Sequence, residues 1–297
     1  MKMSKIPLVL LGVGVLLSGA VYAKSGVFVG LNAGVPITAT NYNLKPNYQQ
    51  FKDQLPTSGI GYTVGAEVGY KQDFNWQFGM RIYASYNFSQ SYGSKKSSEN
   101  DPLLPLAEKF VASDPTLSAF STTVPIALDS NSSVKTDTNL NATLTNHLVA
   151  ANMDFTFKAT KHIGFFLGMG VGADFYSGSY KYDAHAAPSI ILTDFGKAVF
   201  PSTLVANPRL KSLSNPSDHK GSINGATAVG LAVPVNVGVN LDFGSSAFSI
   251  GAKLPLLATA MNIQGPSDQT DASSPSTSYG TIDLKNYILQ AGYSHTF

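Results

Sequence analysis

Residues 60–88 read IGYTVGAEVGYKQDFNWQFGMRIYASYNF, and this stretch decides the fold. Apolar residues alternate along it with small or polar ones, on both sides of a short link at Asp73-Phe74-Asn75. A period of two indicates β-strands with one apolar and one polar face. Both runs are long enough to cross a bilayer, which takes ~9–11 residues, whereas strands of soluble proteins average ~5–6. The stretch therefore predicts a hairpin of two membrane-spanning strands.

Six further segments show the same alternation, which gives eight strands in all. They are residues 25–36, 144–158, 162–177, 224–243, 247–260 and 284–297. Short links alternate with long connections, and the long ones are residues 37–59, 89–143, 178–223 and 261–283. Outer-membrane barrels alternate tight periplasmic turns with long external loops in the same way. We therefore predict an all-β fold: an eight-stranded antiparallel transmembrane β-barrel with short periplasmic turns, long extracellular loops and both termini in the periplasm.

Two prolines interrupt the pattern of alternation. Pro234 and Pro255 lie inside predicted strands, and a closed barrel has no edge strand on which a missing N–H group would be harmless. We expect a local β-bulge at each of them.

The longest connection carries a helix signal of its own. Asp101 can cap the N-terminus, Pro102 suits the first helical position, and Ser113-Asp114-Pro115 ends the pattern. The expected helix has an apolar stripe of Leu103, Leu106, Phe110 and Val111. Such a stripe can pack onto the barrel mouth or neighbouring loops, or it can dock a partner, and both readings stay open.

The N-terminus has the three parts of a secretory signal. Lys2 and Lys5 are followed by an apolar stretch from Ile6 to Leu17, and small residues lead up to Ala23. This layout predicts cleavage after Ala23, and the apolar stretch is short for a membrane-spanning helix, which takes ~20 residues. We expect a signal peptide at residues 1–23 and a barrel at residues 24–297.

The composition agrees with an exported membrane barrel. Without Lys2 and Lys5 the chain has 18 basic and 18 acidic residues, so it lacks the basic excess that a nucleic-acid partner needs. It has no cysteine, which excludes disulfides and thiol catalysis. Only 13% of the residues are charged, about half the usual share, as expected for a barrel whose outer face meets lipid.

Charged residues on the inner face are the candidates for function within the barrel. If Phe74 is the centre of its turn, Glu67 stands opposite Arg81, and a cross-strand pair of opposite charges is favourable. Four further charges are expected to point into the lumen: Asp154, Lys158, Asp174 and Lys253. Because side chains fill the interior of an eight-stranded barrel, we interpret these charges as a network that plugs the lumen. An ion-conducting path is the alternative.

We do not expect the chain to be an enzyme. Its five histidines are His147, His162, His185, His219 and His295. None of them has a matching serine motif, and neither a Gly-x-Ser-x-Gly elbow nor a His-Glu-x-x-His metal pair is present. The sequence therefore nominates no catalytic residue, metal site or cofactor.

The C-terminal part of the chain resembles a known family. Residues 287–297 alternate outward to Tyr293 and the terminal Phe297, and they resemble the recognition strand that the barrel assembly machinery reads. Residues 251–259, which read GAKLPLLAT, together with this ending look like the C-terminal part of the Helicobacter-type outer membrane proteins, the small Hop- or Hor-like barrels. Residues 65–87 and 164–174 are similar too. The resemblance implies a cell-surface barrel in a Gram-negative outer membrane.

Two functions remain open at this point. The first is surface display, in which the loops of a monomeric barrel bind a host glycan or protein, as an adhesin does. The second is a porin-like pore for small solutes. Long loops and a filled lumen favour display. In both cases the expected partners are outer-membrane lipid, lipopolysaccharide and the assembly machinery, with no nucleic acid.

Overall fold

The computed structural model of the chain describes residues 25–102, 129–189, 191, 193–194, 216–264 and 278–297. The expected signal peptide lies outside these residues. The described elements are β1 (Gly26–Leu44), the 3-10 helix η1 (Pro46–Gln54), β2 (Ser58–Asp73), β3 (Phe78–Pro102), β4 (Ser133–Lys158), β5 (Ile163–Ser189), β6 (Ser217–Ala232), β7 (Pro234–Phe243), β8 (Ser246–Pro255), β9 (Thr259–Gln264) and β10 (Ser278–Thr296). No described helix is long and apolar enough to cross a membrane.

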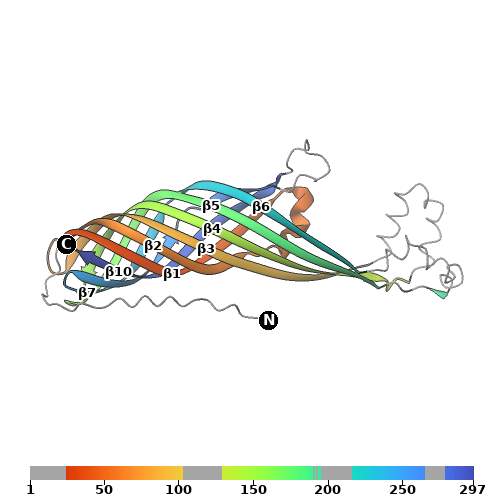
Figure 1. Cartoon of the computed structure of the whole chain (residues 1–297), viewed down its shortest axis with the longest axis horizontal. Coiled ribbons are helices and arrows are strands. Elements are labelled where there is room, and N and C mark those ends of the chain that lie inside the picture. The colour runs from red at the N-terminus through yellow and green to blue at the C-terminus, as the bar shows by residue number, and fades with distance from the viewer. Residues whose placement is uncertain (1–24, 103–128, 190, 192, 195–215, 265–277) are drawn as a thin grey trace.

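The strands form one antiparallel sheet that closes on itself (Figure 1). The chain runs in order from β1 to β5, and β10 pairs with β1 from Phe28↔Thr296 to Leu44↔Gly280. The described residues form ten strands where eight were predicted. The difference arises because β6 and β7 both pair with β5, while β8 and β9 both pair with β10. The ten strands therefore occupy eight positions around the barrel.

The two prolines explain both interruptions. Pro234 begins β7, Pro255 ends β8, and the two residues face one another. The Leu256 N–H donates to the Val233 carbonyl at 3.0 Å. The two prolines are therefore a non-hydrogen-bonded pair, in which the backbone nitrogens point away from the partner strand. The missing N–H of Pro234 therefore interrupts the hydrogen bonds between β7 and β5, and the missing N–H of Pro255 interrupts those between β8 and β10. Residues 254–258 stand opposite only residues 285–287, so the expected bulge is found after Pro255, while at Pro234 the strand is interrupted.

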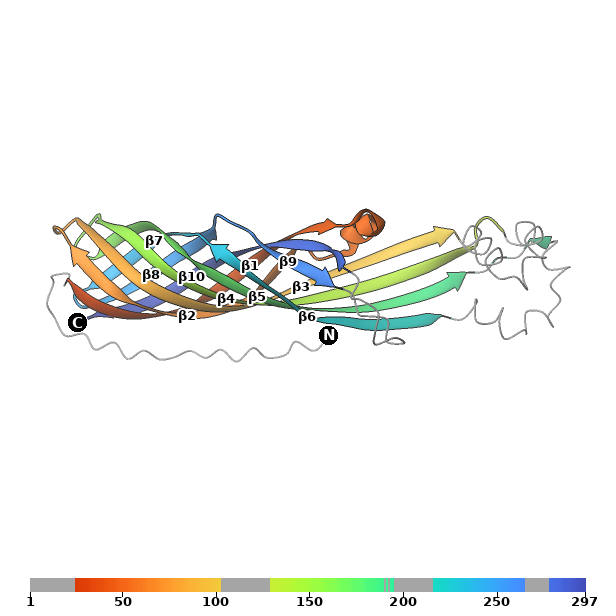
Figure 2. The same cartoon turned by 90° about the horizontal axis from the view of Figure 1, so that it is seen from above.

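Four strands continue far beyond the barrel. β2 pairs with β3 only as far as Ile60↔Tyr92, yet β3 and β4 stay paired to Pro102↔Ser133. Together with the end of β5 toward Ser189 and the start of β6 at Ser217, they form a sheet that we call the extension (Figure 2). The predicted loops at residues 89–143 and 178–223 are thus partly strand. Along β3 and β4 the alternation of apolar and polar residues fades there, because water bathes both faces of this sheet and both faces carry polar side chains. In β5 it continues through residues 180–186, which read YKYDAHA.

The prediction of a helix in the longest connection is wrong at its first two residues. Asp101 and Pro102 lie at the end of β3, paired with Val134 and Ser133, because strand pairing with β4 continues through both residues. The apolar stripe of Leu103, Leu106, Phe110 and Val111 lies outside the described residues. The helix that is described, η1, lies between β1 and β2 instead, inside the predicted loop at residues 37–59.

The short turns and both ends of the sheet lie at one end of the barrel. The Thr296 N–H donates to the Ser245 carbonyl at 2.7 Å, and the Asp73 N–H donates to the Ser25 hydroxyl at 2.9 Å. The turn between β7 and β8 uses Gly244 at φ 74°, a left-handed conformation that favours glycine. This turn end lies opposite the extension (Figures 1 and 2).

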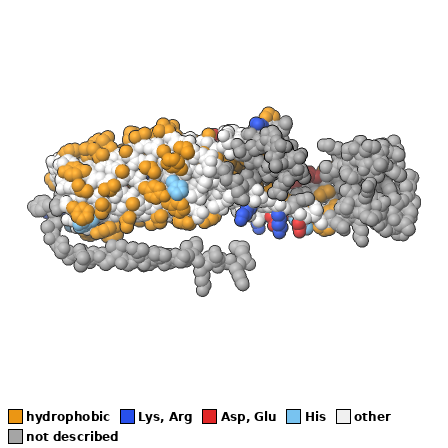
Figure 3. Space-filling view, turned by 45° about the horizontal axis from the view of Figure 1, so that its top comes forward, with side chains coloured by type: hydrophobic (Ala, Val, Ile, Leu, Met, Phe, Trp, Pro, Cys, Tyr) orange, Lys and Arg blue, Asp and Glu red, His pale blue; other side chains and the backbone are white. Residues whose placement is uncertain are grey.

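Apolar side chains are spread over the face of the barrel that Figure 3 shows. Leu31, Val229 and Ile250 are 67%, 69% and 70% exposed, whereas Asn87 and Asp154 on the inner face are fully buried. Aromatic residues of the turn end, among them Trp76 and Phe297, are also exposed. An apolar belt with aromatic residues at its rim is the outer surface that a bilayer requires of a barrel.

Candidate functional site

The middle of the barrel interior is built around one buried ion pair. Arg81 Nη2 donates to Asp154 Oδ2 at 2.7 Å. The Tyr83 hydroxyl donates to the same carboxylate oxygen at 2.9 Å, and Asn236 Nδ2 donates to Oδ1 at 3.1 Å. The Arg81 guanidinium also lies over the Phe166 ring, 4.9 Å from its centroid. The ion pair thus receives the additional hydrogen bonds that a buried pair of charges needs.

Lys253 extends this network toward the outer end. Its Nζ donates to Asn87 Oδ1 at 2.8 Å and to Ser85 Oγ at 3.2 Å. Asn87 in turn donates to Asn32 Oδ1 at 2.7 Å. A chain of amide and hydroxyl groups therefore spans the lumen between strands on opposite sides of the barrel.

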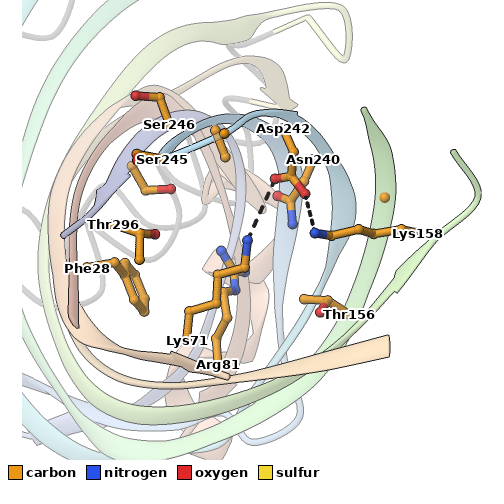
Figure 4. Close-up of a pocket in the computed structure, with 14 residues that line it drawn as sticks. Phe28, Lys71, Arg81, Thr156, Lys158, Asn240, Asp242, Ser245, Ser246 and Thr296 are labelled. Atoms are coloured by element: carbon orange, nitrogen blue, oxygen red, sulfur yellow. Dashed lines mark ion pairs between the residues drawn. The ribbon is translucent and has the colours of Figure 1, made fainter. Parts of the chain in front are cut away.

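A second charged cluster closes the turn end (Figure 4). Lys158 Nζ lies 3.2 Å from Asp242 Oδ2 and 3.6 Å from Asp73 Oδ2, and Lys71 Nζ lies 3.9 Å from Asp242 Oδ1. Together with Arg81 and Thr156 these side chains line a cavity of about 20 Å³. Such a cavity holds about one water molecule.

The outer part of the interior is apolar. A buried cluster, which we call the outer plug, fills the barrel beneath its loop-side mouth. It consists of Tyr42, Leu44, Ala142, Leu144, Tyr176, Tyr180, Met261, Ile263, Ile282 and Leu284. The Tyr42 hydroxyl donates to the Pro56 carbonyl at 2.9 Å, which ties the plug to the end of the β1–β2 connection. Charged, polar and apolar layers thus follow one another along the lumen.

The predicted pairing of Glu67 with Arg81 is wrong. Glu67 stands opposite Ser85, and Arg81 stands opposite Lys71 on β2 and Asp154 on β4. The hairpin turn is centred on Trp76, not on Phe74, because Asn75 Oδ1 accepts from the Gln77 and Phe78 amides at 2.8 Å each and adds residues to the loop. The shift is even, so both residues keep their inward face.

Of the other predicted residues, Asp154 and Lys253 belong to the central network, Lys158 belongs to the turn-end cluster, and Asp174 lies apart from both. Asp154, Lys158, Asp174 and Lys253 are all buried, and the partner of Asp174 is Asn146, whose Nδ2 donates at 2.9 Å. Sequence reasoning missed Lys71, Tyr83, Asn236 and Asp242. All four occupy inward positions of period-two strands, so the same alternation could have nominated them.

Tyr293 and Phe297, near the C-terminus, are the residues predicted to form an assembly signal. The Tyr293 hydroxyl lies 2.9 Å from Ser246 Oγ, and its ring centroid lies 5.2 Å from that of Phe248. Phe297 is 61% exposed. Phe297 is therefore accessible at the turn end, whereas Tyr293 is half-buried.

The extension carries a row of exposed charged side chains along one face. Lys220 Nζ lies 3.5 Å from Asp183 Oδ2, His185 Nδ1 lies 2.7 Å from Asp218 Oδ1, and a shallow groove of about 400 Å³ lies alongside. A hydrogen bond from the Ser98 side chain, followed by Lys135, lowers the pKa of Asp137 below its usual value. Within the described ranges no group of three or more histidine or acidic side chains could hold a metal ion.

Comparisons with known proteins place these features in context. A family model described as Helicobacter outer membrane protein matches residues 65–297, and no curated protein sequence matches the chain. Ail, the attachment invasion locus protein of Yersinia pestis, is 11% identical, with a TM-score of 0.30 over 91% of this chain and 99% of that one. OprG of Pseudomonas aeruginosa is 11% identical, with a TM-score of 0.35 over 94% of this chain and 100% of that one. Neisserial surface protein A is 10% identical, with a TM-score of 0.34 over 92% and 98%.

Proposed function

The chain belongs to the Helicobacter outer membrane protein family, and on this premise we propose that its barrel displays the extension at the cell surface, where it binds a host glycan or protein. The barrel is the membrane anchor in this proposal, and the function resides in the β3–β6 strands beyond it. No step of catalysis is part of the proposed role.

The extension is the observation that carries the proposal. Sixteen-residue strands would be ample for the bilayer, since ~9–11 residues suffice, yet β4 and β5 have 26 and 27 residues. The surplus forms a sheet with polar side chains on both faces. A rigid, solvated sheet held clear of the membrane offers a surface for recognition without the entropic cost of ordering loops.

The filled lumen argues against a pore for small solutes, the alternative expected from the sequence. Two cavities inside the described part of the barrel measure about 20 Å³ and about 10 Å³. Neither exceeds the space of roughly one water molecule, and the outer plug lies across the path.

The orientation follows from the same proposal. We place the turn end and both termini in the periplasm and the extension outside the cell, after removal of residues 1–23 and insertion by the assembly machinery through Tyr293 and Phe297. The barrel would act as a monomer surrounded by lipid and lipopolysaccharide.

A test of display combines binding with topology. Epitope tags after Ser98 and after Lys181 should be accessible to antibody on intact cells, whereas a tag after Asn75 should not. Deletion of the extension should abolish binding of the cells to host tissue while the barrel stays in the membrane. Unchanged binding after the deletion would contradict the display role.

A test of the pore uses purified barrel in a planar bilayer. We expect no reproducible unit conductance. Stepwise, reproducible conductance that persists after deletion of the extension would instead make the barrel a channel.

A further inference from the structure

The barrel wall is interrupted at one height. At Pro234 the pairing with β5 stops at Met169↔Val235 and resumes at Gly172↔Ala232. At Pro255 the pairing with β10 stops at Lys253↔Ile288 and resumes at Thr259↔Leu284. Above this height the described β6 pairs with β5 alone and β9 with β10 alone. We call the unpaired boundary between β6 and β9 the seam.

The seam is weaker than the rest of the wall for a physical reason. In lipid, backbone groups of a barrel are satisfied by pairing between strands, and the seam lacks this pairing. Side chains bridge it instead: a Cβ on Gly230 would collide with the side chain of Thr259. β9 has only six residues, so few hydrogen bonds hold it on its other side.

Apolar surface flanks the seam on both sides. On the outside, Val229, Leu231, Leu256 and Leu257 are 69%, 60%, 53% and 44% exposed. On the inside lies the outer plug, to which β9 itself contributes the buried Met261 and Ile263. An alkyl chain that parts β6 from β9 would therefore pass from lipid to the plug without meeting a charge.

At the foot of the seam, a small pocket joins this apolar region to the polar network. Its wall side includes Val233, Pro234 and Leu257, and its inner side includes Asn146, Asp174 and Lys253. The pocket measures about 10 Å³, so a larger molecule can occupy it only when β9 moves outward.

Lys253 is the cation at the floor of this pocket. It is 3% exposed, and its Nζ has two acceptors, Asn87 and Ser85, for three N–H donors. No described carboxylate lies within 4.0 Å of it. Glu67 and Asp154 interact with this charge only from beyond contact distance. Since buried charges are normally paired in direct contact, the ammonium has a free donor and room for a contacting anion.

We propose that the seam is a binding site for a small anionic amphiphile from the surrounding membrane, such as a long-chain carboxylate. The carboxylate binds the free donor of Lys253, and the alkyl chain lies between β6 and β9 against the outer plug. β9 is the wall segment that moves aside. This site is separate from the extension, so it does not depend on the proposed display function.

Photo-crosslinking in lipid nanodiscs tests the site. The probe is a dodecanoate with a diazirine in its chain, and the labelled residues are mapped by peptide mass spectrometry. We expect labelling of the plug residues Tyr176, Tyr180 and Met261 that excess dodecanoate abolishes and excess dodecylamine does not. Labelling confined to outward residues such as Ile250, or competition by the amine alone, would overturn the proposal.

Two variants identify the anchoring charge. Lys253→Met should reduce interior labelling at least roughly tenfold, the loss expected for a hydrogen bond to a charged group. The matched variant Asp174→Asn, which removes the other charge of the same pocket, should keep or increase labelling. Equal labelling in Lys253→Met, with the barrel folded as judged by its heat-modifiable electrophoretic mobility, would rule out the anchor.

A disulfide across the seam gives a test that leaves Lys253 intact. Val229 and Ala260 are exposed neighbours of the Gly230–Thr259 contact, and the chain contains no cysteine of its own. In the Val229→Cys/Ala260→Cys variant, oxidation should block interior labelling and reduction should restore it. Undiminished labelling of the disulfide-linked form would show that the ligand does not pass the seam.

Discussion

Arg81 and Asp154 show how much a single buried pair can contribute to this barrel. In Asp154→Asn the Arg81 charge stays buried without the carboxylate that contacts it, and loss of one partner of a buried pair costs about 3–5 kcal/mol. We expect a correspondingly lower free energy of unfolding, measured by urea titration in detergent micelles. Glu67→Gln is the control, because no described cation lies within 4.0 Å of Glu67. This variant should lower the free energy of unfolding by less than about 1 kcal/mol. Equal losses in the two variants would contradict the assignment of the pair.

Gly251 is a residue whose lack of a side chain makes room for the ion pair. A Cβ there would lie 2.7 Å from Cζ of Phe166, the ring that supports the Arg81 guanidinium. We expect Gly251→Ala to displace this ring and to destabilise the barrel by about 1–3 kcal/mol, seen as a lower urea midpoint. Gly164→Ala is the control, since the nearest atom to its Cβ would be 3.3 Å away. A midpoint for Gly251→Ala at or above that of the control would show that Phe166 is not confined by Gly251.

At the scale of the element, the β2–β3 hairpin has a register that crosslinking can read. Val68 stands opposite Ala84, whereas Met80 stands opposite Gln72. Directly opposed Cα atoms are ~5.5 Å apart, within disulfide range, and residues displaced by four positions are more than ~10 Å apart. Oxidation should therefore link Val68→Cys to Ala84→Cys and leave Val68→Cys/Met80→Cys reduced, as measured by thiol alkylation. The reverse pattern would restore the register centred on Phe74.

The same hairpin shows how far the sequence could predict this fold. Alternation assigned the correct face to Glu67, Arg81 and Asp154, because the period of a strand is a local property. The predicted register of β2 against β3 was wrong because the Asn75 side chain determines where the turn closes. The alternation of residues does not reveal this hydrogen bonding. The extension was missed because its β3 and β4 strands are polar on both faces, although residues 180–186 of β5 still alternate. The outer plug was missed because it joins residues from β1, β4, β5, β9 and β10 that only the closed barrel brings together.

At the scale of the whole molecule, the barrel should fold without its extension. The interior layers end at the outer plug, against which Leu140 still packs. The described strand residues beyond Lys95↔Leu140 and Tyr180↔Ile223 are exposed or half-buried. We therefore expect a chain with residues 97–138 and 182–221 each replaced by a two-residue Asn-Gly turn to insert into the membrane. Its urea midpoint should change little, since surface changes away from the core are usually within about 0.5 kcal/mol. Electrophoresis of unboiled and boiled samples, with full-length protein beside it, measures whether the shortened barrel is folded. If no heat-modifiable form accumulates, the extension is needed for folding, and its strands would then have to be counted as part of the barrel rather than as an element displayed by it.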